Sequence, residues 1–554
     1  MLRTFIGSIL LACAATTLAA EVTILSAGRI HTSDTRVPKA EAMAWDQNGR
    51  IVALGSAADL SERYPEARRI DAPGRTVIPG LIDAHGHVMG LGYALLRADL
   101  TGTASMDEAI ARLREYEKQL PAGAWLLGGG WDQNRWPGKQ FPTAADLNSA
   151  FPTRAVWLER VDGHAGWANS AALAAASAKA SRALDGDWQP DGGRIERSQG
   201  KPSGVFVDRA MDLVNAVVPA PDRAVREQAL RRAVQAAVAN GLTGVHDMGV
   251  SREDLALMKQ FADDGELPLR LSAYADGSNA ALDDLCSGGL YTHAGGRLQM
   301  HGVKLYMDGA LGSRGAALID DYSDDPGNRG LLLTQPDALE AAVRKAQGCG
   351  VQLATHAIGD LANRLVLDTY ARVLGADSGS DHRWRIEHAQ VVDLDDIARF
   401  APLGVIASMQ PTHATSDMPW AQDRVGAERI KGAYAWQRFI DSGARLALGS
   451  DFPVESSDPR LGLYAATTRQ DRAGTPQGGW LPEQKLSPSE ALRGFTADAA
   501  YAGRDEDQVG RLSTGMRADF VILRQDPLTV APGDVDEVQI QSTWVDGKPV
   551  FEAQ

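Results

Sequence analysis

The sequence predicts an α/β protein built around a (β/α)8 TIM barrel, and three observations support this prediction. Short apolar segments recur through the middle of the chain, and helical patterns separate most of them, an alternation typical of parallel barrels. Strand-like runs divided by turn residues occupy both chain ends, which indicates a separate β unit. A long interval between the first two barrel segments indicates an inserted subdomain.

The two chain ends predict one β-sandwich domain, expected over residues 21–78 and 455–554. The first part contains "VTILSAGRIHT" and "AEAMAWDQNGRIVALG", two runs broken by turn residues. The second part begins with helical patterns and closes with "RADFVILRQDP" and "VDEVQIQSTWVDGKPVFEAQ". Within the last run, the pair Asp546-Gly547 is a hairpin signal between two strands.

The barrel is expected over residues 79–454, with its inserted subdomain at 103–219. His87 and His246 follow the first two strand-like segments and lie 246 − 87 = 159 positions apart, whereas a simple βαβ step needs about 30 residues. The expected strands are, in order, "GLIDAH", "LTGVHDMG", "LRLSAYA", "GVKLYMDG", "VQLATHAIG", "WRIEHAQ", "GVIASMQPTH" and "ARLALGSDFP".

Bulk composition narrows the classes of partner. The 554 residues are 44% hydrophobic and 23% charged, as in globular proteins. The formal net charge of −15 does not favour binding to a negatively charged phosphate backbone, so we expect no nucleic-acid partner. Beyond the N-terminus no apolar run is long enough for a transmembrane anchor. A small-molecule substrate is the expected partner, and a homo-oligomer remains an open alternative.

The first 20 residues resemble a secretory signal peptide, which predicts a periplasmic or secreted protein. Arg3 gives a positive start, an apolar core follows, and small residues close the segment. The stretch "LLAC" around Cys13 also resembles a lipoprotein cleavage site, so a lipid anchor is the alternative. Cys286 and Cys349 are the other two cysteines. Two thiols make neither a disulfide framework nor a zinc knuckle, so any metal must be held by nitrogen and oxygen.

Six residues at the expected strand ends predict a metal site, because the carboxyl ends of barrel strands meet at one mouth. Each has an ordinary structural alternative: a hydrogen-bonded histidine, an aspartate paired with arginine, or a lysine paired with Asp308. Together at one mouth they favour a divalent metal, zinc above all, as one or two ions. The six are His85, His87, Lys304, His356, His388 and Asp451.

Lys304 is the unusual member of this set, since an ammonium group repels metals. A buried lysine with a lowered pKa can be neutral, and a neutral amine can react with carbon dioxide to form a carbamate. Such an N6-carboxylated Lys304 would bridge two ions. The alternative is a plain lysine in an ion pair beside a single metal.

At this point the motifs resemble a known family. "GLIDAHGH", "VKLYMDGALGSRGA", "THAIGD", "RIEHAQ" and "GSDFPVES" resemble the amidohydrolase superfamily. "GGGWDQNRWPGKQFPT" and "VDGHAGWANSAAL" narrow the resemblance to amidohydrolase family 3, the branch similar to N-substituted formamide deformylase. The resemblance covers essentially the whole mature chain. It implies that His85, His87 and Asp451 bind one metal, that His356 and His388 bind a second, and that carboxylated Lys304 bridges them.

The expected function is hydrolysis of a C–N amide-type bond of the N-acyl or N-formyl amine class. A metal-activated water would attack, with Asp451 as general base and acid. A lactone, cyclic-amide or phosphoester hydrolase is the alternative. A periplasmic metal- or solute-binding protein is a further one, although it needs neither the inward aspartate nor the bridging lysine. Candidate substrate contacts are Trp131, Asp132, His164, His246, Tyr306, His413 and Arg314, the last as a carboxylate clamp or a partner of a loop acid.

Overall fold

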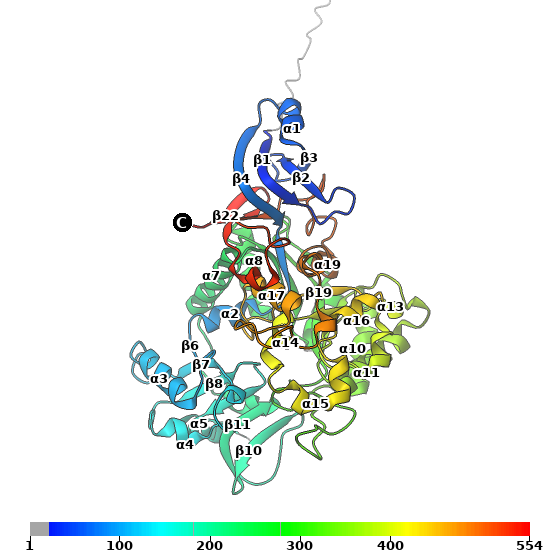
Figure 1. Ribbon diagram of the computed structural model, residues 1–554. Helices are drawn as coiled ribbons and strands as arrows, with labels where there is room; N and C mark the ends of the chain where they lie inside the picture. The colour runs from blue at the N-terminus through cyan, green and yellow to red at the C-terminus, as the bar shows by residue number, and fades with distance from the viewer. Residues whose placement is uncertain (1–20, 181, 278) are drawn as a thin grey trace, which may run out of the picture.

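The computed structural model describes residues 21–180, 182–277 and 279–554, and a parallel barrel lies at its centre (Figure 1). The expected signal peptide, with Cys13, lies outside the described residues. Among the described residues, no helix is both long and apolar enough to cross a membrane.

Eight parallel strands in the described part of the chain form the barrel and confirm the predicted fold class. Their order around the sheet is β19-β18-β17-β16-β15-β13-β12-β5. The barrel closes where Gly86 bridges Phe452 in parallel and the Asp451 N–H donates to the His85 carbonyl at 2.6 Å. The strands are β5 (Leu81–Gly86), β12 (Leu242–Val250), β13 (Arg270–Ala275), β15 (Leu298–Tyr306), β16 (Gln352–Ala357), β17 (Arg385–His388), β18 (Ile406–Met409) and β19 (Leu446–Leu448).

The outer helices cover the barrel with apolar faces. In α10 (Pro336–Cys349), residues Leu339, Val343 and Ala346 recur at helical spacing and are buried in the same core as the strands. Proline opens this helix and Gly350, at φ 68°, ends it in the left-handed conformation that favours glycine. The other helices around the barrel are α2 (Val88–Ala94), α7 (Arg223–Ala239), α8 (Arg252–Asp263), α9 (Asn279–Gly288), α11 (Asp360–Leu374), α12 (Leu394–Ile397), α13 (Phe400–Leu403), α14 (Pro411–Asp417), α15 (Ala421–Arg429) and α16 (Trp436–Asp441).

Three further helices, placed by the sequence prediction in the C-terminal β domain, pack on the barrel instead. They are α17 (Pro459–Thr468), α18 (Pro488–Gly494) and α19 (Ala497–Ala502). Small side chains let α19 approach closely: Ala499 and Ala500 share a buried cluster with Ile82 and Ala84 of β5. The segment after residue 455 therefore belongs to the barrel until the last strands begin.

Strands from both chain ends form one seven-stranded sheet among the described residues, in the order β22-β21-β20-β4-β1-β2-β3 (top of Figure 1). β2 and β21 are four places apart, which is about 19 Å in a flat sheet, yet Trp45 and Trp544 have ring centroids 6.2 Å apart. The expected sandwich is thus a single sheet curled over its own apolar face. Its strands are β1 (Thr23–His31), β2 (Lys39–Trp45), β3 (Ile51–Gly55), β4 (Arg68–Pro79), β20 (Phe520–Leu523), β21 (Ile540–Val545) and β22 (Lys548–Glu552), with α1 (Ala57–Arg63) alongside.

A second subdomain is inserted between α2 and α7 and lies beside the barrel, at the lower left of Figure 1. Its sheet has the order β10-β11-β9-β8-β7-β6. Trp131, Trp136 and Trp167 pack together in its core. Its elements are β6 (Ala98–Asp99), α3 (Met106–Glu117), β7 (Leu126–Trp131), α4 (Ala144–Asn148), β8 (Val156–Arg160), β9 (Ala165–Ala168), α5 (Ser170–Lys179), β10 (Gly193–Ser198), β11 (Lys201–Asp208) and α6 (Asp212–Asn215).

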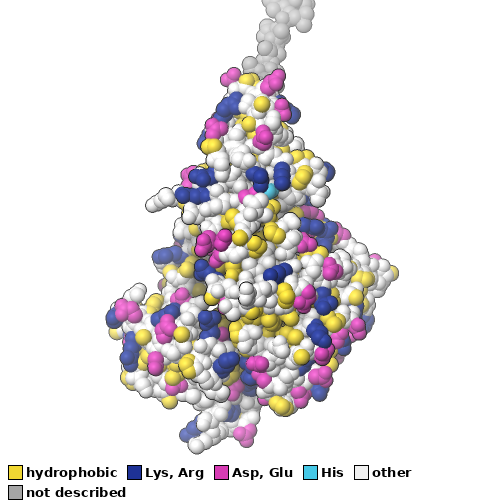
Figure 2. All heavy atoms as spheres, in the orientation of Figure 1, with side chains coloured by type: hydrophobic (Ala, Val, Ile, Leu, Met, Phe, Trp, Pro, Cys, Tyr) yellow, Lys and Arg dark blue, Asp and Glu magenta, His cyan; other side chains and the backbone are white. Residues whose placement is uncertain are grey.

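The remaining features are short or lie at the surface. A disulfide joins Cys286 of α9 to Cys349 of α10, a pairing that the sequence did not predict. On the face shown in Figure 2, basic and acidic side chains are interspersed. The short elements are β14 (Tyr291–Thr292) and the 3-10 turns η1 (Gln133–Arg135), η2 (Arg209–Met211), η3 (Gly375–Asp377), η4 (Ile430–Gly432), η5 (Pro482–Gln484) and η6 (Pro532–Glu537).

Candidate metal centre

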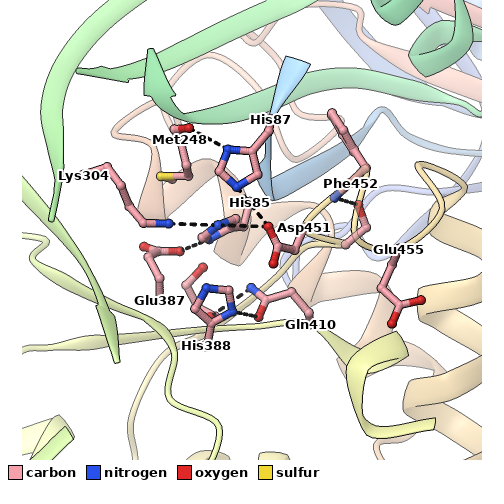
Figure 3. A network of polar contacts seen from close by, with 12 residues as sticks. His85, His87, Met248, Lys304, Glu387, His388, Gln410, Asp451, Phe452 and Glu455 are labelled. Atoms are coloured by element: carbon pink, nitrogen blue, oxygen red, sulfur yellow. Dashed lines mark hydrogen bonds and ion pairs between the residues drawn. The ribbon is translucent and has the colours of Figure 1, made fainter. Parts of the chain in front are cut away.

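The two histidines at the end of the first barrel strand both turn their Nδ1 atom toward an acceptor of the protein. The His85 Nδ1 lies 2.5 Å from a carboxylate oxygen of Glu387, and the His87 Nδ1 donates to the Met248 carbonyl at 2.7 Å (Figure 3). Both partners are acceptors, so each Nδ1 carries a proton, and Nε2 is the nitrogen that faces the site and could bind a metal. That orientation is typical of metal-ligating histidines.

Asp451 lies against both of these Nε2 atoms. Its Oδ1 is 3.4 Å from the His85 Nε2 and 3.1 Å from the His87 Nε2. This oxygen is buried and has no hydrogen bond within the described chain. Asp451 has φ 62° and His388 has φ 73°, and such strained conformations in non-glycine residues cluster at functional sites.

His388 and His356 extend the group along one side of the mouth. The His388 ring lies 4.8 Å from the His85 ring and 4.6 Å from the His356 ring, centroid to centroid. The His388 Nδ1 contacts the Gln410 Oε1 at 2.8 Å. The His356 Nε2 is buried and makes no hydrogen bond with any of the described residues.

The donor set fits a divalent metal. Ligand atoms of His85, His388 and Asp451 all lie within 4.8 Å of one another. Two buried polar atoms beside them, the Asp451 Oδ1 and the His356 Nε2, lack partners in the described structure, and buried polar groups are rarely left unpaired. Imidazole and carboxylate are the ligands that zinc and similar ions prefer.

The electrostatic environment favours neutral histidines and an ionised aspartate. Burial lowers the pKa of His85 to about 4 and those of His356 and His388 well below their usual value. Burial opposes ionisation of Asp451, but the neighbouring His85 and the hydrogen-bonded His413 hold the pKa of Asp451 well below its usual range. Neutral imidazoles and a carboxylate are the forms that bind metal.

Lys304 reaches the same place from β15. Its Nζ lies 3.1 Å from the His85 Nε2, and burial lowers its pKa to about 8. Asp308, the expected partner of a plain lysine, instead accepts three backbone hydrogen bonds, from Ala317, Ile358 and Gly359. The lysine is therefore near the histidines and has a neutral fraction at neutral pH.

A buried ion pair under the site was missed by sequence reasoning. Glu387 binds the His85 Nδ1 with one oxygen and the Arg385 Nε with the other, at 2.5 Å in each case. Arg385 also donates to the Ala84 carbonyl and to the Ser408 hydroxyl, both at 2.6 Å. The signal was present in "RIEH", where Arg385 and Glu387 stand on either side of Ile386 along a buried strand.

Three of the candidate substrate contacts lie beside the candidate metal ligands. His164, from the inserted subdomain, has its ring centroid 5.4 Å from that of His356, and Tyr306 is 6.1 Å from it. The His413 Nε2 contacts the second oxygen of Asp451 at 3.2 Å. Burial opposes protonation of His413, but hydrogen bonds with Asp451 and Glu455 raise its pKa to about 10.

Two other candidates lie in the protein interior. Trp131 is fully buried in the core of the inserted subdomain and donates to the Leu158 carbonyl. His246 lies in the middle of β12, not at its end, and accepts a hydrogen bond from Arg385 at 2.9 Å. These positions do not fit the expected contact with a substrate.

The last two candidates are engaged in ion pairs. Asp132 accepts a hydrogen bond from the buried Arg160 at 2.6 Å. Arg314 binds both oxygens of Asp324, at 3.2 and 2.9 Å, which is the loop-acid alternative. Both arginines neighbour the contact between the inserted subdomain and the barrel. A cavity of about 460 Å³ there is lined by Asn134, Lys139, Gln140, Arg314, Ser323, Asp324, Trp420, Asp423 and Arg424.

Fold and site together define a metal-dependent hydrolase. Residues 68–551 match the model of the Amidohydrolase family, and the chain belongs to that family, which confirms the resemblance seen in its motifs.

Relatives are similar over nearly their full length. The chain is 34% identical to the putative amidohydrolase YtcJ of Bacillus subtilis (strain 168), covering 91% of this chain and 95% of that one. It is 28% identical to N-substituted formamide deformylase of Arthrobacter pascens, covering 94% and 96%. A solved structure, an uncharacterized metal-dependent hydrolase from Pyrococcus horikoshii OT3, is 29% identical with a TM-score of 0.74, covering 93% of this chain and 99% of that one.

Proposed function

We propose that this hydrolase cleaves the C–N bond of an N-acyl or N-formyl amine, with zinc as its metal and Asp451 as general base and acid. The observation that carries the proposal is the Asp451 Oδ1, buried and without a hydrogen bond beside two histidine Nε2 atoms. The similarity to N-substituted formamide deformylase supports the choice of an amide.

Five side chains and one modified lysine would hold the metal. His85, His87 and Asp451 would hold one ion, and His356 and His388 would hold a second. Lys304, whose Nζ lies 3.1 Å from the His85 Nε2, would be a ligand of both ions once carboxylated. When bound, a divalent metal supplies an activated water and polarises the scissile carbonyl.

Residues of the chain would then transfer the proton of the attacking water. Asp451 is ionised at neutral pH, so it can accept a proton from the attacking water and pass it to the departing nitrogen. His413 holds the second Asp451 oxygen and is itself held by Glu455 at 3.3 Å. This support keeps the carboxylate aimed at the site while its charge changes.

The test is the Asp451→Asn variant, with exposed Asp187→Asn as the matched control. Loss of the general base should lower kcat on N-formyl and N-acetyl amines by at least about 100-fold. The amide oxygen keeps the shape of the side chain, so zinc measured by atomic emission should stay near the wild-type content. Turnover equal to that of the control would remove Asp451 from this role.

We also propose that the protein acts in the periplasm or outside the cell. The Cys286–Cys349 disulfide supports an oxidising compartment, because such bonds are rare in the cytosol. N-terminal sequencing of the protein from fractionated cells tests this. A mature chain that begins near residue 21 in the periplasmic or culture fraction is expected, and an uncleaved cytosolic chain would contradict it.

A further inference from the structure

A histidine–aspartate pair connects the inserted subdomain to the metal centre. His164 stands in the turn before β9 and Asp208 stands at the end of β11. The Asp208 N–H donates to the His164 carbonyl at 2.9 Å, and the His164 Nδ1 contacts the Asp208 Oδ1 at 2.7 Å. A further bond, from the His164 N–H to the Asp162 carboxylate, is 3.1 Å long. Backbone and side-chain bonds thus fix the imidazole in one orientation.

The barrel leaves room for this pair through two glycines of the motif "DGALGSRG". A Cβ atom at Gly309 would lie 2.8 Å from both carboxylate oxygens of Asp208. A Cβ atom at Gly315 would lie 2.6 Å from the Oδ2. Any other residue at either position would therefore push the carboxylate away. The side chain of Asp208 is wholly buried, so this loop of the barrel is shaped around the pair.

The ring of His164 lies beside the candidate metal ligands. Its side chain is 20% exposed, and its Nε2 has no hydrogen bond to any described residue. Its ring lies beside His356, which lies beside His388, which in turn belongs to the cluster with Asp451. His164 and Asp451 therefore stand at the two ends of a row of imidazoles.

We propose that His164, oriented by Asp208, contacts the substrate directly and donates a hydrogen bond from Nε2 to the carbonyl oxygen of the scissile bond. This inference rests on the proposed hydrolysis of an acyl or formyl group. The Asp208 carboxylate accepts the Nδ1 proton and fixes the ring, and with a proton on each nitrogen the Nε2 is the remaining donor. A fixed donor aimed at an oxygen that gains charge stabilises the transition state more than the ground state.

The pair also gives the inserted subdomain a part in the reaction. The barrel supplies the metal ligands, including Asp451. The subdomain supplies His164, the proposed hydrogen-bond donor on the far side of His356. Tyr306 shares that side with His164, since both rings lie near His356. The substrate is thereby held between two structural units and not on the barrel alone.

The experiment compares His164→Leu, His164→Gln and Asp208→Asn, with His293→Leu and Asp187→Asn as controls remote from the site. His164→Leu should lower kcat by about 100-fold, the effect of removing one such donor, with KM changed only a few-fold. His164→Gln keeps an N–H of similar reach and should restore about tenfold of that loss. Asp208→Asn keeps an acceptor but loses the charge, so kcat should fall by about tenfold. Zinc content and melting temperature should match the controls.

Two results would overturn the inference. Wild-type kcat in His164→Leu or in Asp208→Asn would show that the pair does not serve the reaction, and loss of zinc in the folded His164→Gln protein would make His164 a ligand instead. If His164→Leu does not fold, the kcat of His164→Gln is compared with that of wild type, and a loss of about tenfold is expected. p-Nitrophenyl acetate, an ester with the same carbonyl, separates the two proposals. If wild type cleaves only the ester, the amide assignment fails while the effect of His164→Leu on the ester still tests the donor.

Discussion

Replacing Glu387 by Gln probes how the barrel interior supports the metal centre. Glu387 is fully buried and binds both the His85 Nδ1 and the Arg385 guanidinium, at 2.5 Å each. The glutamine keeps the shape of the side chain but removes its charge. Arg385 then stays buried without its only carboxylate among the described residues, and His85 loses its strongest acceptor.

Two magnitudes follow from these contacts. Breaking a buried ion pair on one side costs about 3–5 kcal/mol, because the remaining charge is left uncompensated. The retained bonds from Arg385 to the Ala84 carbonyl and the Ser408 hydroxyl place the expected loss near the lower limit, about 3 kcal/mol. Removing the group that orients a metal-binding histidine weakens metal affinity by about 10- to 100-fold.

Urea unfolding of the metal-free protein and zinc titration against a competing chelator measure the two effects separately. Glu428→Gln is the matched control, since its pair with Lys431 lies at the surface and contributes little. A Glu387→Gln protein that binds zinc as tightly as the control would refute the orienting role. Unchanged unfolding would refute the energetic one.

Four further outcomes are expected. Replacing Cys286 and Cys349 by Ser opens a loop of 63 residues and should lower the free energy of unfolding by up to about 4 kcal/mol in urea titrations. Arg314→Ala should leave KM for an acidic substrate unchanged, because its guanidinium is already bound to a loop acid. Burial lowers the pKa of His246 to about 3, below its unfolded value of about 6.5. Stability from this neutral ring is present above pH 6.5 and is lost as the pH falls toward 3, so His246→Gln should flatten that part of a stability–pH curve without changing KM. Gly309→Ala should lower kcat, measured at wild-type zinc content, because the new methyl group displaces the carboxylate behind His164.

The candidate residues at the strand ends lie together in the structure for a physical reason. A histidine or aspartate at the carboxyl end of a barrel strand has few places to point except the mouth. His246 was misplaced because β12 continues to Val250 and the histidine lies mid-strand. Trp131 also ends a strand, but that strand belongs to the inserted sheet and not to the barrel.

The supporting contacts were beyond sequence reasoning because they join distant parts of the chain. Glu387 meets His85 across 302 positions, and no local pattern links the two. Asp208 has no signal of its own, and its partner glycines lie in a loop of the barrel. The first pairing depends on how the strands are arranged around the barrel and the second on how the subdomain docks, and spacing along the chain specifies neither.

The curled sheet can be completed only after the last strands of the chain have been translated. β4 ends at Pro79 and pairs with β20, which begins at Phe520, so one edge of β4 waits for a partner translated roughly 440 residues later. At about 5–20 residues per second, that wait is roughly 20 to 90 s. During it the early strands expose backbone groups that invite pairing with other chains. The chain therefore depends on its last strands for protection of its first, and a truncated product would remain prone to aggregation however well its barrel folded.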